Sequence, residues 1–359
     1  MPRTTKPHIE PAHSRRLRQF QISSLNLFLY GLLWIAVLLL AGCASPLDQL
    51  RTATPVASTS APTATFKFTA TVTPSPVFTA TPSPSPLPAS SPTATETPLP
   101  PLRFAVIGDY GGNGPPERDV AEMVKGWQPE FVITTGDNNY PLGSAETIDL
   151  TIGQYYQEFI YPYKGQFGPG ADQNRFFPSL GNHDWMTDQA RPYLDYFELP
   201  GNERYYDFVW EPVHFFVLDS DSHEPDGFRA DSAQATWLKE RLANSSEPWK
   251  VVYFHHAPYS SGVHGSVTWM RWPFQEWGAS VVLSGHDHTY ERLSIDGFPY
   301  FVNGLGGGSR YNFENITDGS QARYNADYGA MLVTASEQEM LFEFYARTGE
   351  LIDTFSLRN

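Results

Sequence analysis

Short apolar runs that lead to a polar side chain recur along the C-terminal part of the chain. The runs at 103–107, 131–135, 177–180, 250–254 and 280–284 carry few charges, which is typical of strands buried on both faces. The polar residues that follow them are Asp109, Asp137, Asn182, His255 and His286. Because ligands bind beyond the carboxyl ends of strands in open α/β sheets, the pattern predicts one shared site.

Other segments complete an α/β pattern. Apolar runs at 214–218, 329–335 and 340–345 predict further strands. A helix is expected around 117–125, and an N-capped amphipathic helix is expected at 231–242. Strands that alternate with helices indicate an α/β domain, which we expect to span residues 102–359.

The N-terminus has the anatomy of an export signal. A basic stretch ends at Arg18, and the apolar run 27–42 is shorter than the roughly 20 residues of a membrane-spanning helix. The end of this run, Leu40-Ala-Gly-Cys43, resembles the bacterial lipobox. This resemblance implies that residues 1–42 are a signal peptide and that Cys43 carries a lipid. The alternative is an uncleaved signal anchor, and both readings place the remaining chain outside the cytoplasmic membrane.

Residues 43–101 predict a linker rather than a domain. Proline recurs there with serine, threonine and alanine, and apolar residues are too sparse to offset the conformational entropy of the chain. Proline-rich sequence favours an extended stalk. We therefore expect a domain held away from the membrane of the bacterial cell envelope.

Charge and cysteine content restrict the possible partners. The formal net charge is −15 and the pI is about 5.0, so the surface repels polyanions and we expect no nucleic-acid partner. The same charge repels phosphate esters, unless bound metal ions supply positive charge at the site. The single cysteine excludes an internal disulfide.

The polar residues beyond the strands form a candidate metal-ligand set. Taken alone, each Gly-Asp pair is an ordinary turn, whereas the two histidines in Gly285-His-Asp-His288 are the strongest single signal. Aspartate, asparagine, tyrosine and histidine suit hard or borderline metals, and there are enough of them for two ions. The candidate ligands are Asp109, Asp137, Tyr140, Asn182, His255, His286 and His288.

The order of these motifs resembles the five sequence blocks of the purple acid phosphatases, within the calcineurin-like metallophosphoesterase superfamily. The blocks here are Gly-Asp109-Tyr-Gly, Gly-Asp137-Asn-Asn-Tyr140, Gly-Asn182-His183-Asp184, Val252-Tyr-Phe-His255 and Gly-His286-Asp-His288. The resemblance implies a two-sheet β-sandwich flanked by helices. It also implies that Asp109, Tyr140 and His288 bind Fe(III), while Asp137 bridges to a divalent iron, zinc or manganese ion held by Asn182, His255 and His286.

The same resemblance implies hydrolysis of small phosphate monoesters by a hydroxide that bridges the two ions. His183 and His264 would face the substrate phosphate. Two positions depart from the family pattern, since His256 directly follows the ligand histidine and Tyr110 stands where tryptophan is common. We expect His256 to pack behind the site rather than to act in catalysis, and we leave Arg292 and Arg310 outside the site.

Two other functions remain open at this point. One is a phosphodiesterase of the same superfamily with two divalent ions and Tyr140 outside the coordination sphere. The other is a surface binding protein without turnover, although such a protein does not require this complete ligand set.

Overall fold

The computed structural model describes residues 100–359, which belong to one compact unit that begins at Ser91. The predicted signal peptide, the lipidation site at Cys43 and nearly all of the linker lie outside the described residues. Within the described part, no helix is both long and apolar enough to cross a membrane.

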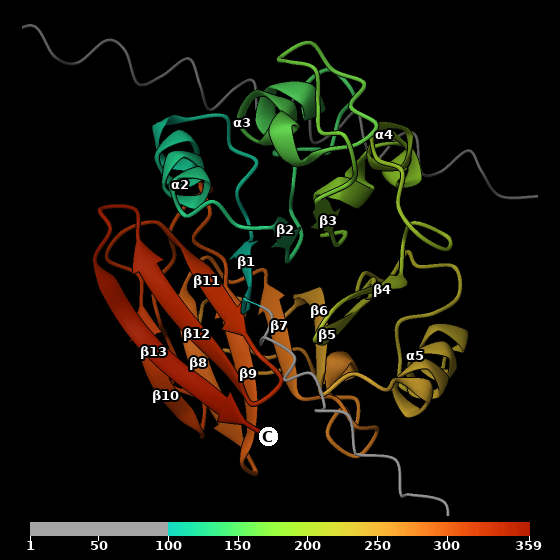
Figure 1. The fold of residues 1–359 in the computed structure, drawn as a ribbon, viewed down its shortest axis with the longest axis vertical. Helices are drawn as coiled ribbons and strands as arrows, with labels where there is room; N and C mark the ends of the chain where they lie inside the picture. The colour runs from blue at the N-terminus through green and yellow to red at the C-terminus, as the bar shows by residue number, and fades with distance from the viewer. Residues whose placement is uncertain (1–99) are drawn as a thin grey trace, which may run out of the picture. The chain divides into compact units, whose positions relative to one another are not determined.

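The first of two mixed sheets has six strands in the order β13-β12-β11-β1-β2-β3 (Figure 1). β1 pairs in parallel with β2, and β2 pairs in parallel with β3, so the carboxyl ends of these three strands lie at one edge. The strands are β1 (Leu102–Ile107), β2 (Phe131–Thr134), β3 (Phe176–Pro178), β11 (Gly329–Ala335), β12 (Glu339–Ala346) and β13 (Leu351–Arg358).

The second sheet has seven strands in the order β10-β8-β9-β7-β6-β5-β4. β5, β6 and β7 are mutually parallel neighbours, so their carboxyl ends also share an edge. The strands are β4 (Tyr206–Trp210), β5 (Val213–Val217), β6 (Trp249–His256), β7 (Val281–Gly285), β8 (Tyr290–Ile295), β9 (Phe298–Asn303) and β10 (Ser320–Tyr324).

Four α-helices and several shorter helical segments connect the strands of the described region. The α-helices are α2 (Pro115–Gly126), α3 (Gln154–Tyr156), α4 (Arg191–Tyr196) and α5 (Ala233–Asn244). A π-helical turn (Asp149–Gly153) precedes α3, and 3-10 turns span Gln157–Phe159, Asp184–Met186, Asp188–Ala190 and Thr268–Met270.

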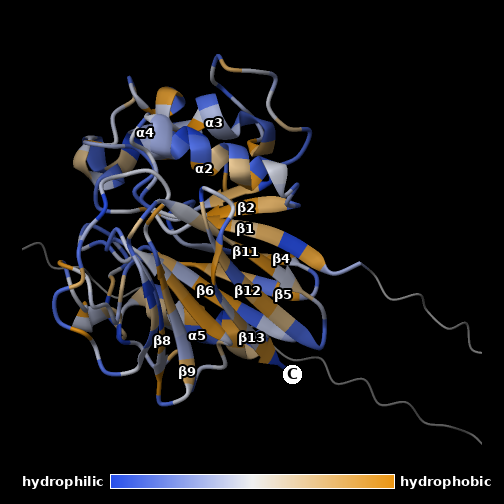
Figure 2. Cartoon of the chain, turned by 90° about the vertical axis from the view of Figure 1, so that its left-hand side faces the viewer, coloured by the Kyte–Doolittle hydropathy of each residue, from blue (hydrophilic) through white to orange (hydrophobic). Residues whose placement is uncertain are grey.

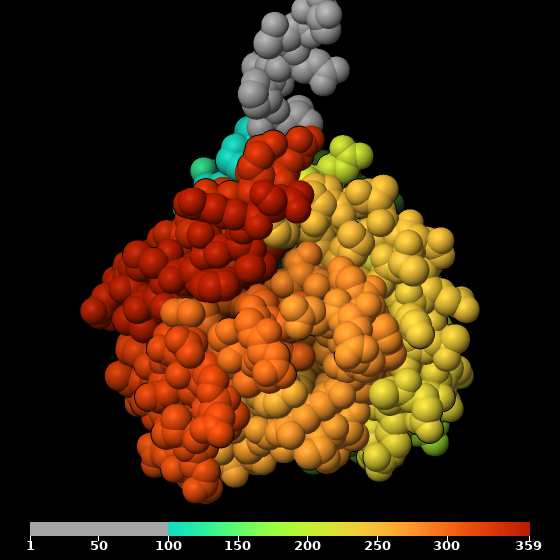
Figure 3. Space-filling model, turned by 90° about the horizontal axis from the view of Figure 1, so that it is seen from below, coloured from blue at the N-terminus to red at the C-terminus, as the bar shows by residue number. Residues whose placement is uncertain are grey.

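The sheets pack face to face and carry helices on their outer faces, as Figures 1 and 2 show. Between the sheets, the ring of Phe215 from β5 meets the rings of Phe104 and Phe131 edge-on, with centroids 5.0 and 5.3 Å apart. A second apolar cluster joins the first sheet to α2, and a third joins the second sheet to α5. From below (Figure 3), the red C-terminal strands, the orange β7–β9 region and the yellow region that includes α5 share the surface.

Local sequence explains where the two long helices begin. Pro115 occupies the first turn of α2, where its missing N–H costs no helical hydrogen bond. The Ser232 side chain caps α5 by accepting a hydrogen bond of 3.1 Å from the Ala235 N–H. The helix expected at 231–242 is therefore confirmed, with Ser232 as its cap.

The predicted two-sheet α/β sandwich is confirmed, but five strands were missed. All eight runs interpreted as strands overlap strands of the structure, whereas β4, β8, β9, β10 and β13 were not predicted. Several of these missed strands are half exposed, as in β10, where no residue is buried. A half-exposed strand lacks the continuous apolar run that identifies a buried one.

Candidate metal centre

The predicted ligands meet where the carboxyl ends of the parallel strands of the two sheets come together. β1, β2 and β3 lead to Asp109, Asp137 and Asn182, while His255 is the penultimate residue of β6 and β7 leads to His286. The backbone N–H of His286, from the second sheet, donates to Asp109 Oδ2 of the first at 3.0 Å. One site therefore draws on both sheets.

A first group of donors surrounds the phenol oxygen of Tyr140. Tyr140 Oη lies 2.9 Å from His288 Nε2, 3.0 Å from Asp137 Oδ2 and 3.4 Å from Asp109 Oδ1. The ligand atoms of Asp109, Asp137 and His288 lie within 4.8 Å of one another, and all three residues are buried. Four donors from three segments are thus close enough to share one ion.

A second group of donors gathers around His255. Its Nε2 lies 3.1 Å from Asn182 Oδ1, 3.2 Å from His286 Nδ1 and 3.4 Å from Asp137 Oδ2. Asp137 Oδ2 therefore belongs to both groups. The structure brings all seven predicted ligands together, and an oxygen and imidazole donor set of this kind fits two hard or borderline metal ions. The individual ligand assignments stay predictions.

The backbone at three of these ligands is strained. Asp109, Asp137 and His286 have φ values of 54°, 53° and 72°, in the left-handed region that non-glycine residues rarely adopt. A side chain on the preceding Gly285 would place its Cβ 2.4 Å from Asp109 Oδ2. The glycines in the sequence motifs are therefore required for the close approach of neighbouring strand ends.

Burial and neighbouring charges set the protonation of the centre. Burial, together with the adjacent His255, lowers the pKa of His286 far below its usual range, which keeps this imidazole in the neutral form that binds metals. Burial would also lower the pKa of His255, but the Asp137 carboxylate raises it to about 10. A cation bound between His255 and Asp137 would displace this proton.

The two histidines predicted to face phosphate flank the ligand groups. His183 Nδ1 lies 2.6 Å from the Pro141 carbonyl oxygen, and its Nε2 lies 3.9 Å from Asp137 Oδ2. The exposed His264 places its ring 4.4 Å from the ring of His286. Both imidazoles therefore border the centre on its accessible side.

His256 lies behind the centre. It is 8% exposed, its Nδ1 is 2.9 Å from Ser220 Oγ, and its ring centroid is 4.5 Å from that of His286. Burial and the neighbouring His255 lower its pKa to about 3. A buried, neutral ring that packs on a predicted ligand matches the expectation that His256 supports the site rather than acts in catalysis.

One residue that the sequence analysis missed covers the first group of donors. The ring of Tyr311 stacks on that of His288 at 4.1 Å, and it meets the ring of His264 edge-on at 5.3 Å. The glycine run 306–308 lets the chain approach, since a Cβ on Gly308 would lie 3.1 Å from His288 Cε1 and 3.2 Å from Tyr140 Cε2. The glycine run that follows β9 was the sequence signal that could have indicated this close approach.

The two arginines left outside the site are held elsewhere. Arg292 forms a paired contact with Asp353, at 2.7 and 3.0 Å. Arg310 donates to the Asn325 carbonyl at 2.9 Å and lies over the ring of Tyr328.

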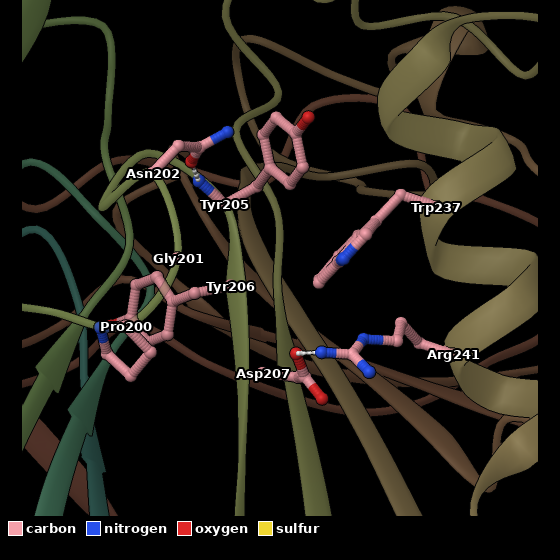
Figure 4. Close-up of a pocket in the computed structure, with 8 residues that line it drawn as sticks. All are labelled: Pro200, Gly201, Asn202, Tyr205, Tyr206, Asp207, Trp237 and Arg241. Carbon is pink, nitrogen blue, oxygen red and sulfur yellow. Dashed lines mark hydrogen bonds and ion pairs between the residues drawn. The ribbon is translucent and has the colours of Figure 1, made fainter.

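A separate pocket of about 340 Å³ lies between β4 and α5 (Figure 4). An ion pair of 3.3 Å between Asp207 and Arg241 borders it, and the rings of Tyr205 and Trp237 form part of its wall. It is lined by Pro200, Gly201, Asn202, Tyr205, Tyr206, Asp207, Trp237 and Arg241, and none of these is a predicted site residue.

Comparison with known families identifies the domain. The sequence model described as "Calcineurin-like phosphoesterase" matches residues 102–290, a little more than half of the chain. The chain belongs to the calcineurin-like phosphoesterase family. Membership in this family makes it a hydrolase of phosphate esters, and the resemblance inferred from the motif blocks is confirmed.

Within this family, the chain is similar to acid phosphatases. It is 26% identical to purple acid phosphatase 17 of Arabidopsis thaliana over 58% of this chain and 69% of that one. It is 25% identical to tartrate-resistant acid phosphatase type 5 of Mus musculus over 58% of this chain and 73% of that one. Such relatives of a calcineurin-like phosphoesterase imply a dinuclear metal centre, for which the Asp109, Asp137 and His288 cluster is the candidate.

Solved structures show the same fold. A purple acid phosphatase from yellow lupin superposes with a TM-score of 0.57 at 18% identity, over 72% of this chain and about half, 54%, of the lupin chain. GAP50 of Plasmodium, described as the anchor in the inner membrane complex, superposes with a TM-score of 0.58 at 18% identity, over 72% of this chain and 89% of that one.

Proposed function

We propose that this calcineurin-like phosphoesterase is an exported phosphatase that hydrolyses phosphate monoesters at an Fe(III)–M(II) centre. The observation that carries the proposal is the pair of donor groups that share Asp137 Oδ2, one of which contains the Tyr140 phenol. A phenol oxygen within 3.4 Å of two carboxylates and an imidazole forms an oxygen-rich donor set, which suits a hard ion such as Fe(III).

The proposed ligands divide between the two ions. Asp109, Tyr140 and His288 would hold Fe(III), Asn182, His255 and His286 would hold a divalent iron, zinc or manganese ion, and Asp137 would contact both. When bound, the two ions lower the pKa of a water molecule and polarise a phosphate oxygen.

The chain's own residues orient the substrate and move protons. His183 donates its Nδ1–H to the Pro141 carbonyl at 2.6 Å, which leaves Nε2 directed toward Asp137. His264 is exposed, and within residues 100–359 its ring makes no hydrogen bond, so both ring nitrogens are free for a substrate. The two imidazoles donate hydrogen bonds to the phosphate oxygens, and one of them protonates the departing alkoxide.

Turnover measured together with metal content tests this proposal against its alternatives. The purified protein should contain about two metal ions per chain, one of them iron, and should hydrolyse phenyl phosphate much faster than diphenyl phosphate. Preference for the diester with two divalent ions would support the phosphodiesterase alternative. Two bound ions without turnover on either ester would support the binding-protein alternative.

The Fe(III) assignment predicts a coloured protein. A phenolate bound to Fe(III) transfers charge to the metal and absorbs visible light, whereas zinc and manganese(II) sites do not. Tyr140→Phe should therefore abolish the visible band, while circular dichroism shows an intact fold. Tyr311→Phe is the matched control, because Tyr311 stacks on His288 without contributing a donor to either group, and it should retain the band. A colourless, fully active wild type that contains divalent ions alone would contradict the assignment.

Export and lipid anchoring form a separate part of the proposal, supported by the sequence around Cys43. We propose that the mature chain begins at Cys43, carries a lipid there and stays in the bacterial cell envelope. Cys43→Ser should leave the protein without the lipid mass at its N-terminus and change its partitioning between the detergent and aqueous phases. Equal detergent partitioning and equal N-terminal mass in the two proteins would refute lipidation at Cys43.

A further inference from the structure

The loop that carries His264 is held by two carboxylates, one in the connection between β7 and β8 and one on β8 itself. Residues 260–265 follow β6, and two buried side chains accept hydrogen bonds from the loop. Glu291 on β8 accepts from the Ser261 N–H at 2.7 Å and from the Ser261 hydroxyl at 2.6 Å. Asp287, which lies between the predicted ligands His286 and His288, holds the other end of the loop.

Asp287 makes three hydrogen bonds to this loop and is fully buried. Its Oδ1 accepts from the His264 N–H at 2.9 Å, and its Oδ2 accepts from the Gly265 N–H at 3.1 Å and from the Ser260 hydroxyl at 2.5 Å. The fit is tight, since a Cβ on Gly262 would lie 2.3 Å from Asp287 Oδ1. A buried carboxylate with three donors fixes the backbone of the loop on both sides of His264.

The two phosphate-facing histidines are oriented by different means. His183 has its ring held directly, because its Nδ1 contacts the Pro141 carbonyl at 2.6 Å. The ring of His264 has no such partner within residues 100–359 and packs between the rings of His286 and Tyr311. The place of the His264 ring therefore depends on the place of its backbone, which Asp287 holds.

From these contacts we infer that Asp287 is a positioning residue that sets His264 against the metal centre for contact with the substrate phosphate. The inference deepens the proposed function and rests on it. The segment 286–288 would then supply two ligands and also align the imidazole opposite them. Since a displacement of about 1 Å in a catalytic group can cost roughly 100-fold in rate, loss of this anchor should impair turnover while both ligands remain.

A double-mutant cycle between Asp287 and His264 tests this inference. In Asp287→Asn, an amide NH₂ group replaces a carboxylate oxygen that accepts hydrogen bonds from the loop. We expect kcat on phenyl phosphate to fall by roughly 10–100-fold, while about two ions per chain are retained. In the His264→Ala background, the same change should alter kcat by less than about threefold, because there is no imidazole left to position. Calorimetry with inorganic phosphate should show the same pattern, with weaker binding in Asp287→Asn only where His264 is present.

Asp149→Asn is the matched control for loss of a carboxylate. Asp149 also accepts three hydrogen bonds, from the Tyr163 and Tyr196 hydroxyls and from the Gln166 N–H, and these partners are not predicted site residues. Asp149→Asn should leave kcat unchanged in both the wild-type and the His264→Ala backgrounds. An unchanged kcat in Asp287→Asn, or losses that simply multiply in the double mutant, would overturn the inference.

A second variant keeps the test decisive if Asp287→Asn disturbs the neighbouring ligands. The Ser260 hydroxyl donates to Asp287 and accepts from the Gly262 N–H at 3.0 Å. Ser260→Ala should lower kcat by several-fold with His264 present and have no effect in the His264→Ala background, and additive losses would overturn the inference.

If His264→Ala keeps wild-type kcat, the positioning role fails while phosphatase activity stands. A wild type without turnover on monoesters would instead reject the proposed function.

Discussion

Asp137→Asn should lose both metal ions and all measurable phosphatase turnover. The carboxylate oxygen Oδ2 lies 3.0 Å from Tyr140 Oη and 3.4 Å from His255 Nε2, so one side chain serves both donor groups. The amide removes the negative charge that neutralises two cations and offers a single acceptor oxygen in place of two. Metal analysis after gel filtration should show a fall from about two ions per chain to near zero, and turnover should fall to the background rate of the assay.

The control for this result must separate metal loss from unfolding. Asp137 Oδ1 also accepts the His183 N–H at 2.9 Å, so the variant should be compared with wild type by circular dichroism. Asp149→Asn, which removes a carboxylate away from the predicted ligands, should keep both ions and full turnover. Two ions per chain in a folded Asp137→Asn protein would contradict a bridging role.

His264→Ala should reduce kcat by roughly 10²–10⁴-fold, the usual range for loss of a general acid or base, while both ions remain bound. The physical reason is that the His264 imidazole lies beside the centre, with its ring 4.4 Å from that of His286, but belongs to neither group of predicted metal ligands. The variant therefore removes a phosphate contact and a proton donor, and not a ligand. Steady-state kinetics and metal analysis on the same preparation check both halves of this expectation.

A surface histidine gives the matched comparison. His223 is also exposed, with its Nδ1 2.6 Å from Asp221 Oδ1, and His223→Ala should leave kcat and metal content unchanged. Loss of an ion in His264→Ala would instead make His264 a ligand. A wild-type kcat with an unaltered pH profile would make it an ordinary loop residue.

The candidate site was more predictable from sequence than the sheets that carry it. Asp109, Asp137 and His286 each follow a glycine after an apolar run, and the structure explains this local signal by the left-handed backbone of the ligand and by the space that the glycine leaves. The edge strand β13 carried no comparable signal, because none of its residues is buried and a half-exposed strand lacks a continuous apolar run.

Residues that support the site through non-local contacts were also hidden. Tyr311 was missed, although its ring stacks on His288, because nothing in its neighbourhood marks it apart from the preceding glycines. Asp287 was visible as the middle residue of Gly-His-Asp-His, but its hydrogen bonds to the backbone of His264 and Gly265 span more than twenty residues of sequence. Such partners become evident only when the loop and the strand connection are seen together.

The sequence by itself determined the α/β class and the donor set, because buried strands, the glycines before the ligands and the ligand types are properties of short segments. Only the tertiary structure showed the contacts themselves: Asp137 Oδ2 lies 3.0 Å from Tyr140 Oη and 3.4 Å from His255 Nε2, His256 faces Ser220, and Asp287 holds the loop of His264. These relations depend on β1 lying beside β2 and on β6 lying beside β7. Strand order results from pairing and burial across the whole domain, so no single segment encodes it.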